Sequence, residues 1–444
     1  MQLDMTKGKP MMVITRFFIP MFIGNLFQQM YNIVDAIVVG QFVGKDAFAA
    51  VGSASAVIVF MTSILTGLSM GASALFSQLY GAKNYDKLKK TISTAFIFIF
   101  AISAVLTIAT LAFLPQIIRF YQMPQETAAY ASEYLQYIFA SLIFVGMYNA
   151  CAFLLRSIGD SKSPLYFLIA SSVLDTILNL VFVIVLNMGV FGVAFSTLLA
   201  QGLAAIGCGI YTIKRMKFLE FEKKDIVFNG KILKDVAEFS VLTALQQSAS
   251  SLGMMLIQGL VNTFGATVMA AFAAASKIDE FANRPLQDLS NAFSTYTAQN
   301  EGAGHKQRIR DGFRATTKII IMMSAVISTL AFVFAPDLIA IFVKRESLDV
   351  IAIGVSYLRI VCVFYVLLGF IVMFYGFFRG IGSIKISILM TVVSQGTRVL
   401  LAYSFASTLG FSGICWAIVV GWFLSDLLGF YMYKKVMVKE TLLT

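Results

Sequence analysis

Polar residues that could bind a cation interrupt an apolar stretch near the start of the sequence. Asp35 follows polar residues that step back along the chain by three or four positions, namely Asn32, Gln29, Gln28 and Asn25. Residues at this spacing share one face of an α-helix. A buried carboxylate is stable only against protein or water, and it could take up a proton or a cation reversibly. The alternative is that Asp35 simply reaches water at a nearby helix end.

A second acidic position lies in the apolar stretch around residue 175. Asp175 and Asn179 are spaced i, i+4 and continue a helix face that includes Ser171. If this face meets Asp35, the two carboxylates could share a proton. Their oxygens and the Asn179 carbonyl could instead coordinate Na⁺, which prefers oxygen ligands. A hydrogen-bond network that only fixes helix packing is the alternative.

A third set of charged residues has alternating sign and helical spacing. Its members are Lys277, Glu280, Arg284 and Asp288. They predict either a self-neutralising ladder of ion pairs or a face that binds substrate. Asp279 lies off this face, and Pro285 should kink the helix. The remaining isolated charges in apolar segments are Arg359, Arg398 and Asp426, which we interpret as structural.

These residues must be positioned by membrane-spanning helices. Hydrophobic residues make up 59% of the 444 positions and charged residues only 13%, whereas a soluble domain carries about 25% charged residues. Apolar segments long enough to cross the bilayer recur along the chain, and lipid requires them to be helices. We predict twelve, near 13–40, 47–80, 90–114, 130–155, 163–187, 190–213, 236–264, 267–298, 314–343, 350–378, 384–407 and 411–433.

The net charge of +11 is explained by topology. Of the 34 basic residues, 26 fall in the terminal segments and alternate loops, near 7–16, 83–90, 156–162, 214–234, 306–318, 379–385 and 434–439. The opposite loops hold only Lys45, Arg119, Lys344 and Arg345. The positive-inside rule therefore predicts an inner-membrane protein with both termini in the cytoplasm. Little basic charge is left for a nucleic-acid partner, and none is predicted.

The sequence offers little for metal or covalent chemistry. Its four cysteines lie singly in or near apolar segments, and its one histidine, His305, lies in a basic loop. No nucleophile–base set or metal-ligand spacing is present. We therefore predict no enzyme activity and no cofactor.

The chain also repeats itself. Arg156 to Lys162 matches Arg379 to Lys385 at an offset of 223, Gly189-x2-Gly192 matches Gly410-x2-Gly413, and Gln28-Gln29 matches Gln246-Gln247 at 218. Each half contains six predicted spans, so the halves share one orientation, as in transporters with parallel repeats. We predict an N-terminal six-helix bundle at 1–213, a cytoplasmic linker at 214–235 and a C-terminal bundle at 236–444.

Several motifs resemble one family. They are Pro20, the run Gln28 to Gly40 with Asp35, Gly44, the Gln78-x2-Gly81-Ala82 helix end, the Arg156-x2-Gly-Asp-x-Lys162 turn and the Gly-x2-Gly turns. This pattern is similar to MATE (multidrug and toxic compound extrusion) transporters, closer to the DinF-like than to the NorM-like branch. The resemblance implies two six-helix bundles related by a pseudo-twofold axis along the membrane normal, with a V-shaped cleft. It also implies export of small amphipathic, often cationic compounds in exchange for H⁺ or Na⁺.

The resemblance assigns roles to some of these residues. Asp35 corresponds to an essential cation-binding aspartate, and Pro20 to a proline whose helix bend is linked to protonation of that aspartate. The family has Asn-x3-Asp where this chain has Asp175-x3-Asn179, so the donor set is kept in reversed order. Helix seven carries the polar residues Gln246 and Gln247 but Gly253 or Met254 in place of an acid, so no second cation site is expected there.

The resulting prediction is a monomeric antiporter. Its coupling site comprises Asp35, Asp175, Asn179 and Asn32, and its candidate substrate-contacting residues are Gln28, Gln29, Gln246, Gln247 and the charged set from Lys277 to Asp288. A flippase for a lipid-linked precursor is the alternative, although that reading favours a basic cleft and fourteen spans. A channel is a further alternative.

Overall fold

The computed structural model describes residues 3–120, 125–222, 225, 228–343 and 345–441, apart from some side chains within these ranges. All regular secondary structure in the described part of the chain is helical, and none of it is a strand. It forms two compact units. The first comprises Met1–Met5 and Arg16–Ala244, and the second comprises Thr6–Thr15 and Leu245–Thr444.

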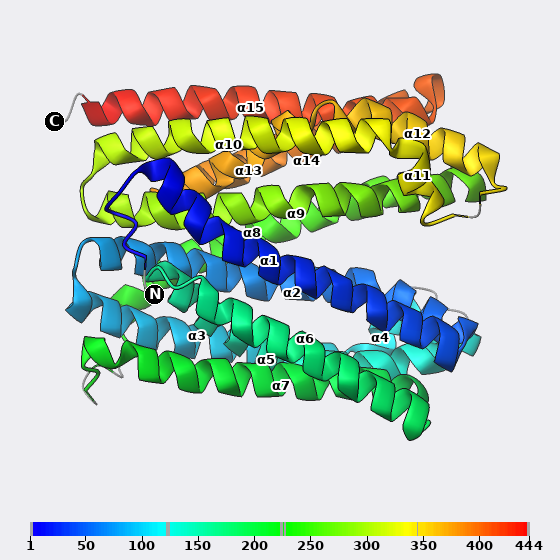
Figure 1. The fold of residues 1–444 in the computed structure, drawn as a ribbon, viewed down its shortest axis with the longest axis horizontal. Helices are drawn as coiled ribbons and strands as arrows, with labels where there is room; N and C mark the ends of the chain where they lie inside the picture. Colours follow the sequence, from blue (N-terminus) through cyan, green and yellow to red (C-terminus); the bar gives the residue numbers. More distant parts are fainter. Residues whose placement is uncertain (1–2, 121–124, 223–224, 226–227, 344, 442–444) are drawn as a thin grey trace. The chain divides into compact units, whose positions relative to one another are not determined.

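The first unit is assembled around one central helix. Its elements are α1 (Pro10–Val38), the π-helical turn η1 (Val39–Val43), α2 (Lys45–Gly81), α3 (Tyr85–Ala112), α4 (Leu114–Phe120), α5 (Gln125–Ser157), α6 (Lys162–Leu180), the π-helical turn η2 (Val181–Val185), α7 (Gly189–Arg215) and the 3₁₀ turn η3 (Met216–Leu219). Helix α5 packs against α2, α3 and α7, and α6 packs against α7. The long helices of this unit run alongside one another (Figure 1).

The second unit is also built of long helices that pack against one another. Its elements are α8 (Gly230–Asn262), whose first residues belong to the first unit, α9 (Ala266–Gly302), α10 (Lys306–Val333), α11 (Ala335–Ala340), α12 (Leu348–Cys362), α13 (Tyr365–Gly380), α14 (Ile384–Leu409) and α15 (Phe411–Thr441). Helix α14 packs along α15, and α9 packs against α12 and α13. Helices α12 and α13, which together are long and apolar enough for one span, are bent by 55° at the break between them.

The spans match the sequence prediction. Among the described residues, nine helices are long and apolar enough to cross a membrane, and the bent α12–α13 pair makes ten. Helices α8 and α9, with 33 and 37 residues, coincide with the other two predicted segments. Their charged and amide side chains lower their hydropathy. An all-α membrane protein with twelve helical spans is therefore confirmed.

The predicted repeat is visible in the backbone. Gly159 and Gly382, which occupy matching positions in the two Arg-containing turns, have φ values of 91° and 79°. Gly189 and Gly410, which open the matching Gly-x2-Gly turns, have φ values of 58° and 59°. These left-handed conformations favour glycine. The two halves thus turn the chain in the same way at matching points.

The boundary between the units falls inside a helix. Within the first unit, a Cβ added at Gly71 of α2 would lie 2.2 Å from the carbonyl oxygen of Phe239 in α8, and one at Gly67 would lie 2.5 Å from the Cα of Ala244. Glycine lets the two helix backbones approach this closely. The start of α8 is thereby packed onto α2, and the predicted linker 214–235 contains η3 and the first residues of α8.

Candidate functional site

The first unit brings Asp35 and Asn179 into direct contact. The amide Nδ2 of Asn179 in α6 donates a hydrogen bond to Oδ1 of Asp35 in α1 at 2.6 Å. Asn179 is fully buried and Asp35 is half-buried. The polar faces that the sequence places on two separate helices therefore meet, 144 residues apart in the chain.

Asp175 lies one helical turn before Asn179 and is also buried. The hydroxyl of Thr197 in α7 lies 3.5 Å from its Oδ2, at donor distance. The phenol of Tyr134 in α5 is within electrostatic range of both Asp35 and Asp175. Four helices thus contribute polar groups to one cluster, which we call the acidic site: Asp35, Tyr134, Asp175, Asn179 and Thr197.

The acidic site adjoins an apolar cluster. Buried valines from α1, η1, η2 and α7 form this cluster, together with Ala47, and Tyr134 and Val51 pack on it: Val38, Val39, Val183, Val190 and Val193. Removing water strengthens the electrostatic interactions of the neighbouring carboxylates. The Oδ1 atom of Asn179 is buried and has no hydrogen-bond partner among the described residues. This oxygen is available as a ligand for a small cation.

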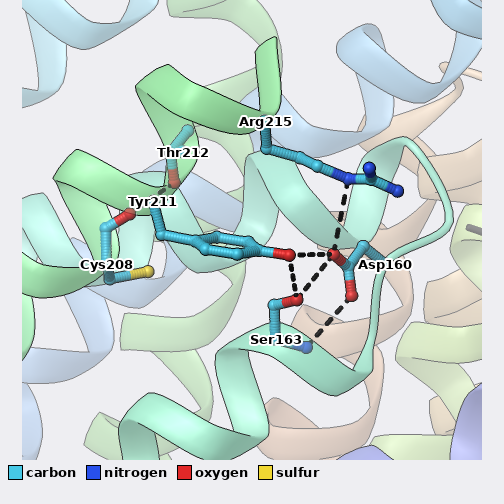
Figure 2. A network of polar contacts seen from close by, with 6 residues as sticks. All are labelled: Asp160, Ser163, Cys208, Tyr211, Thr212 and Arg215. Carbon is cyan, nitrogen blue, oxygen red and sulfur yellow. Dashed lines mark hydrogen bonds and ion pairs between the residues drawn. The ribbon is translucent and has the colours of Figure 1, made fainter. Parts of the chain in front are cut away.

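A polar network at the start of α6 fixes the helix that carries Asp175 and Asn179. Asp160 accepts hydrogen bonds from the backbone N–H of Ser163 at 3.0 Å and from its hydroxyl at 2.7 Å. Tyr211 of α7 donates to the same carboxylate at 3.4 Å, and Arg215 Nε lies 4.0 Å from it. Figure 2 shows these side chains converging on Asp160. The Arg-x2-Gly-Asp-x-Lys turn is therefore a structural anchor between α6 and α7.

The other predicted site residues of α1 differ in how far they are buried. Pro20 is a buried residue inside the helix. Gln28 is exposed and Gln29 is half-buried. The side chain of Asn32 lies outside the described residues.

The charged residues of α9 divide into two groups. Glu280 pairs with Arg284 at 2.7 Å and with Lys277 at 3.6 Å, and the three side chains are between 39% and 64% exposed. Asp288 is buried, with 3% of its surface exposed. Lys277, Glu280 and Arg284 thus form ion pairs along α9, and a substrate-binding role for this face stays a prediction. On α8, Gln246 is buried and Gln247 is half-buried.

A carboxylate that sequence spacing left outside the charged face of α9 has close partners. Asp279 accepts hydrogen bonds from the phenols of Tyr357 at 2.6 Å and of Tyr365. These tyrosines lie on α12 and α13, one on each side of the 55° bend. The sequence held no signal for this cluster, because the tyrosines are 78 and 86 residues away.

The isolated charges of the second unit are in different environments. Arg359 lies over the ring of Phe332, 5.3 Å from its centroid, and is exposed. Asp426 is buried, and both of its carboxylate oxygens lack a hydrogen-bond partner among the described residues. Arg398 is buried and contacts the thioether of Met254. Within the described part of the chain, no group of three or more His, Cys, Asp or Glu side chains could hold a metal ion.

The comparison that decides the family is a double match. The MatE family model matches residues 20–181 and again residues 243–404. The chain belongs to the MatE family. The second match begins 223 residues after the first, the offset at which the two Arg-containing turns repeat.

Individual MATE proteins resemble the chain along nearly its whole length. The "Probable multidrug resistance protein YpnP" of Bacillus subtilis is 26% identical over 97% of this chain and 96% of its own length. A structure described as an outward-facing conformation of a multidrug resistance MATE family transporter has a TM-score of 0.94 at 25% identity, covering 99% of this chain and 98% of its own. A Pyrococcus furiosus transporter, described as having a binding pocket of reverse polarity, has a TM-score of 0.93 at 25% identity, with 98% of both chains covered. The chain is thus a multi-pass membrane protein of a transporter family.

Proposed function

We propose that this MATE protein exports small amphipathic, cationic compounds by antiport with H⁺ or Na⁺. The observation that carries the proposal is the hydrogen bond between Asn179 and Asp35 beside the buried Asp175. Ionisable groups inside a membrane are costly and are generally retained for function. Relatives described as a probable multidrug resistance protein and as a multidrug export protein support the export of several small compounds. We also propose that the chain belongs to the DinF-like rather than the NorM-like branch, since its motifs are more similar to those of the former.

Both coupling ions are compatible with the donor set of the acidic site. Two carboxylates beside each other do not ionise independently, so one proton could be shared. Na⁺ would be bound by carboxylate oxygens together with the amide oxygen of Asn179, since sodium, like other hard cations, prefers oxygen ligands. The unpartnered Oδ1 of Asn179 fits this second option. Either ion would reduce the negative charge between α1 and α6.

Coupling requires that the ion and the exported compound stabilise different conformations of the protein. In our proposal, a cation arriving from outside neutralises Asp35 and weakens its hydrogen bond from Asn179. Helix α1 then bends at Pro20, where a backbone hydrogen bond is missing. The bend releases the exported compound outward, and the protein returns to its inward-open state by alternating access.

The direct test uses the purified protein in proteoliposomes. Efflux of a fluorescent organic cation is measured under an imposed H⁺ gradient, an imposed Na⁺ gradient and no gradient. We expect one gradient to drive uphill efflux in the wild type and to fail with Asp35→Asn. Equal uphill efflux by both proteins would refute the role of the acidic site. If neither the compound nor the ion moves uphill, antiport itself is refuted.

We further propose an inner-membrane location with both termini and the 214–235 linker in the cytoplasm. The protein would be a monomer with two functional bundles at 1–213 and 236–444. The four native cysteines are buried, so single introduced cysteines can be labelled against a low background. A membrane-impermeant reagent applied to intact cells should label Gly44→Cys but not Gly230→Cys. The reverse pattern would contradict the topology, and a dimer in cross-linking and light-scattering measurements would contradict the monomer.

A further inference from the structure

The first helix of each half begins in the unit of the other half. Residues Thr6–Thr15, which include the start of α1, belong to the second unit, and α1 continues from Arg16 in the first unit, where it carries Asp35. Helix α8 does the reverse, since it belongs to the first unit up to Ala244 and then to the second unit. Each of these two helices is therefore a covalent connection through which a movement in one unit can reach the other.

The residues that precede this crossing are held by the first unit. The backbone N–H of Leu3 donates a hydrogen bond to the carbonyl oxygen of Gly159 at 3.0 Å, and a Cβ added at Gly159 would lie 2.1 Å from the carbonyl oxygen of Leu3. Glycine is thus required at this turn for the close approach of the two backbones. Met5 is fully buried. The chain therefore leaves the first unit from a fixed point.

Arg308, near the start of α10, holds the next residues in the second unit. Its Nη1 donates a hydrogen bond to the carbonyl oxygen of Gly8 at 2.9 Å, and its Nε donates to Oδ1 of Asn300 at 3.0 Å. The guanidinium also lies over the ring of Tyr296, 5.8 Å from its centroid. All of these residues belong to the second unit. Gly8 lies two positions before Pro10, the first residue of α1, so Arg308 binds the backbone just outside that helix.

The guanidinium is oriented by groups that are themselves fixed. Asn300 and Tyr296 are fully buried at the end of α9. The hydroxyl of Tyr296 donates to the carbonyl oxygen of Arg308 at 2.8 Å, and Nδ2 of Asn300 donates to the carbonyl oxygen of Tyr296 at 2.8 Å. Because a guanidinium is planar, fixing one edge sets the direction of its other donors. The network therefore presents a charge-assisted hydrogen-bond donor to Gly8.

We propose that Arg308 is a positioning residue for transport, which fixes the start of α1 to the second unit. The inference rests on the proposed function. In that mechanism a cation at Asp35 bends α1 at Pro20, just after the helix enters the first unit at Arg16. A bend moves the two ends of a helix relative to each other, so it acts on the second unit only if the start of α1 is held there.

Without the bond from Arg308, the exposed residues around Gly8 would absorb the bend. The cation could still bind at Asp35, but its binding would no longer favour one conformation of the whole protein. Coupling depends on such a difference between conformations. Loss of Arg308 should therefore slow transport while leaving the binding of ion and exported compound intact.

The test separates the rate of transport from binding. Arg308→Gln is assayed for efflux of the fluorescent cationic dye in proteoliposomes under the coupling-ion gradient, and for dye binding to the purified full-length protein in detergent. We expect the maximal efflux rate to fall about tenfold, the rate equivalent of one lost charge-assisted hydrogen bond. The dye concentration for half-maximal efflux and the dye affinity should both stay within about twofold of the wild type, as for a change confined to the rate.

Three further variants locate the effect. Arg308→Lys should retain part of the rate, because a positive donor remains while the planar fork is lost. Gly8→Val disturbs the same contact from the other side, since Gly8 has a φ of 79° and a Cβ there would lie 3.3 Å from Cγ2 of Val13. Combined with Arg308→Gln it should cause no further loss, because both changes remove one interaction. Arg314→Gln is the matched control and should transport at the wild-type rate, since this exposed arginine of the same helix pairs only locally with Asp311 at 3.7 Å.

Hydrogen–deuterium exchange follows the movement itself. Asp35→Asn imitates the neutralised site, so it should change exchange near Asn179 in the first unit and also in the α9–α10 turn, residues 302–306, of the second unit. When Arg308→Gln is added, the change near Asn179 should remain and the change in the turn should disappear. A change in the turn that persists without Arg308 would contradict the inference.

Three results of the transport assays would also overturn it. The first is wild-type efflux by Arg308→Gln at normal expression. The second is a parallel loss of efflux, dye binding and thermal stability in that variant, which would indicate a purely structural contact. The third is additive loss in the double variant with Gly8→Val, which would mean that Arg308 acts through another group. Failure of the proposed function would look different, because Asp35→Asn would then show wild-type gradient-driven efflux.

Discussion

The two units show how a repeated helix pair can carry opposite charge. In the first unit α1 and α6 meet at the acidic site, and in the second unit α8 and α14 meet at Arg398. Asp35 and Asn179 join α1 to α6 by a hydrogen bond, whereas Arg398 meets α8 through a thioether. In the second unit the carboxylate is on α9 instead, held by two phenols on either side of a helix bend. Helix packing is therefore repeated, but the placement of ionisable groups is not.

This difference predicts that the two units have different roles in transport. The first unit has carboxylates and an amide oxygen suited to a small cation. In the second unit the carboxylate of Asp279 is held by two phenols, and the guanidinium of Arg398, which also lies in the described part of the chain, forms no ion pair with it. If coupling belongs to the first unit alone, neutral substitutions should affect the two units unequally. The predictions that follow are ordered from the largest expected effect to the smallest.

Asp35→Asn should have the largest effect. The amide imitates the protonated carboxyl, so the protein should fold and retain dye binding. Gradient-driven efflux should fall roughly 10- to 100-fold, the rate equivalent of losing a charge-assisted hydrogen bond. The measurement is uphill dye efflux in proteoliposomes, normalised to the amount of inserted protein. Wild-type efflux would place the coupling group elsewhere.

Asp175→Asn should weaken coupling without abolishing it, because Asp35 retains its charge and its bond from Asn179. We expect the coupling-ion concentration for half-maximal efflux to rise about tenfold, as for one weakened ligand. Asp279→Asn is the matched substitution in the second unit, and it should shift this concentration by less than about threefold. An effect of Asp279→Asn as large as that of Asp175→Asn would end the proposed division between the units.

Asp160→Ala should affect stability more than transport. The substitution removes acceptors for Ser163 and Tyr211 and leaves Arg215 without this carboxylate. We expect a loss of about 1–3 kcal/mol of unfolding free energy, typical of a buried polar group that loses its partner. Thermal unfolding in detergent measures the loss. The ion selectivity of efflux should stay unchanged, and a switch of coupling ion would show that the turn does more than anchor α6.

Lys277→Gln should have the smallest effect. Glu280 keeps its 2.7 Å pair with Arg284, and exposed ion pairs contribute only about 0–1 kcal/mol. Stability should change by less than about 0.5 kcal/mol, and efflux should change by less than about twofold for every cationic dye tested. Altered ranking among several dyes, at normal expression, would mean that this face of α9 contacts substrate.

The sequence predicted the spans and the polar faces because both are local properties. A helix that crosses lipid needs an apolar run of fixed length, and a polar stripe such as that ending at Asp35 stands out within it. The contact of this stripe with Asn179 could be anticipated, since buried polar groups need partners. The repeat likewise followed from matching turns.

Partners contributed by single polar residues on other helices could not be predicted. No sequence pattern around Thr197 or Tyr134 indicates that they belong to a site. Hydroxyl-bearing residues are common in membrane helices for packing reasons. Asp279 was set aside because it lies off the charged face of α9, yet tertiary packing gives it two phenols. The position of the unit boundary inside α8 likewise depends on the close approach at Gly71.

The π-helical turn η2 also has an evolutionary consequence. From Lys162 to Gly189 the first half advances 27 positions, whereas from Lys385 to Gly410 the second half advances 25. In the first half α6 passes into η2, while α14 continues as a regular α-helix to Leu409. A π-turn accommodates one extra residue within a helix and is frequent near functional positions, so η2 accounts for one of the two additional positions. The non-helical residues 186–188 between η2 and α7 accommodate the other. After duplication, the ancestral halves therefore diverged by insertion or deletion as well as by substitution, a few residues beyond Asn179. An alignment of the two halves should open its gap there.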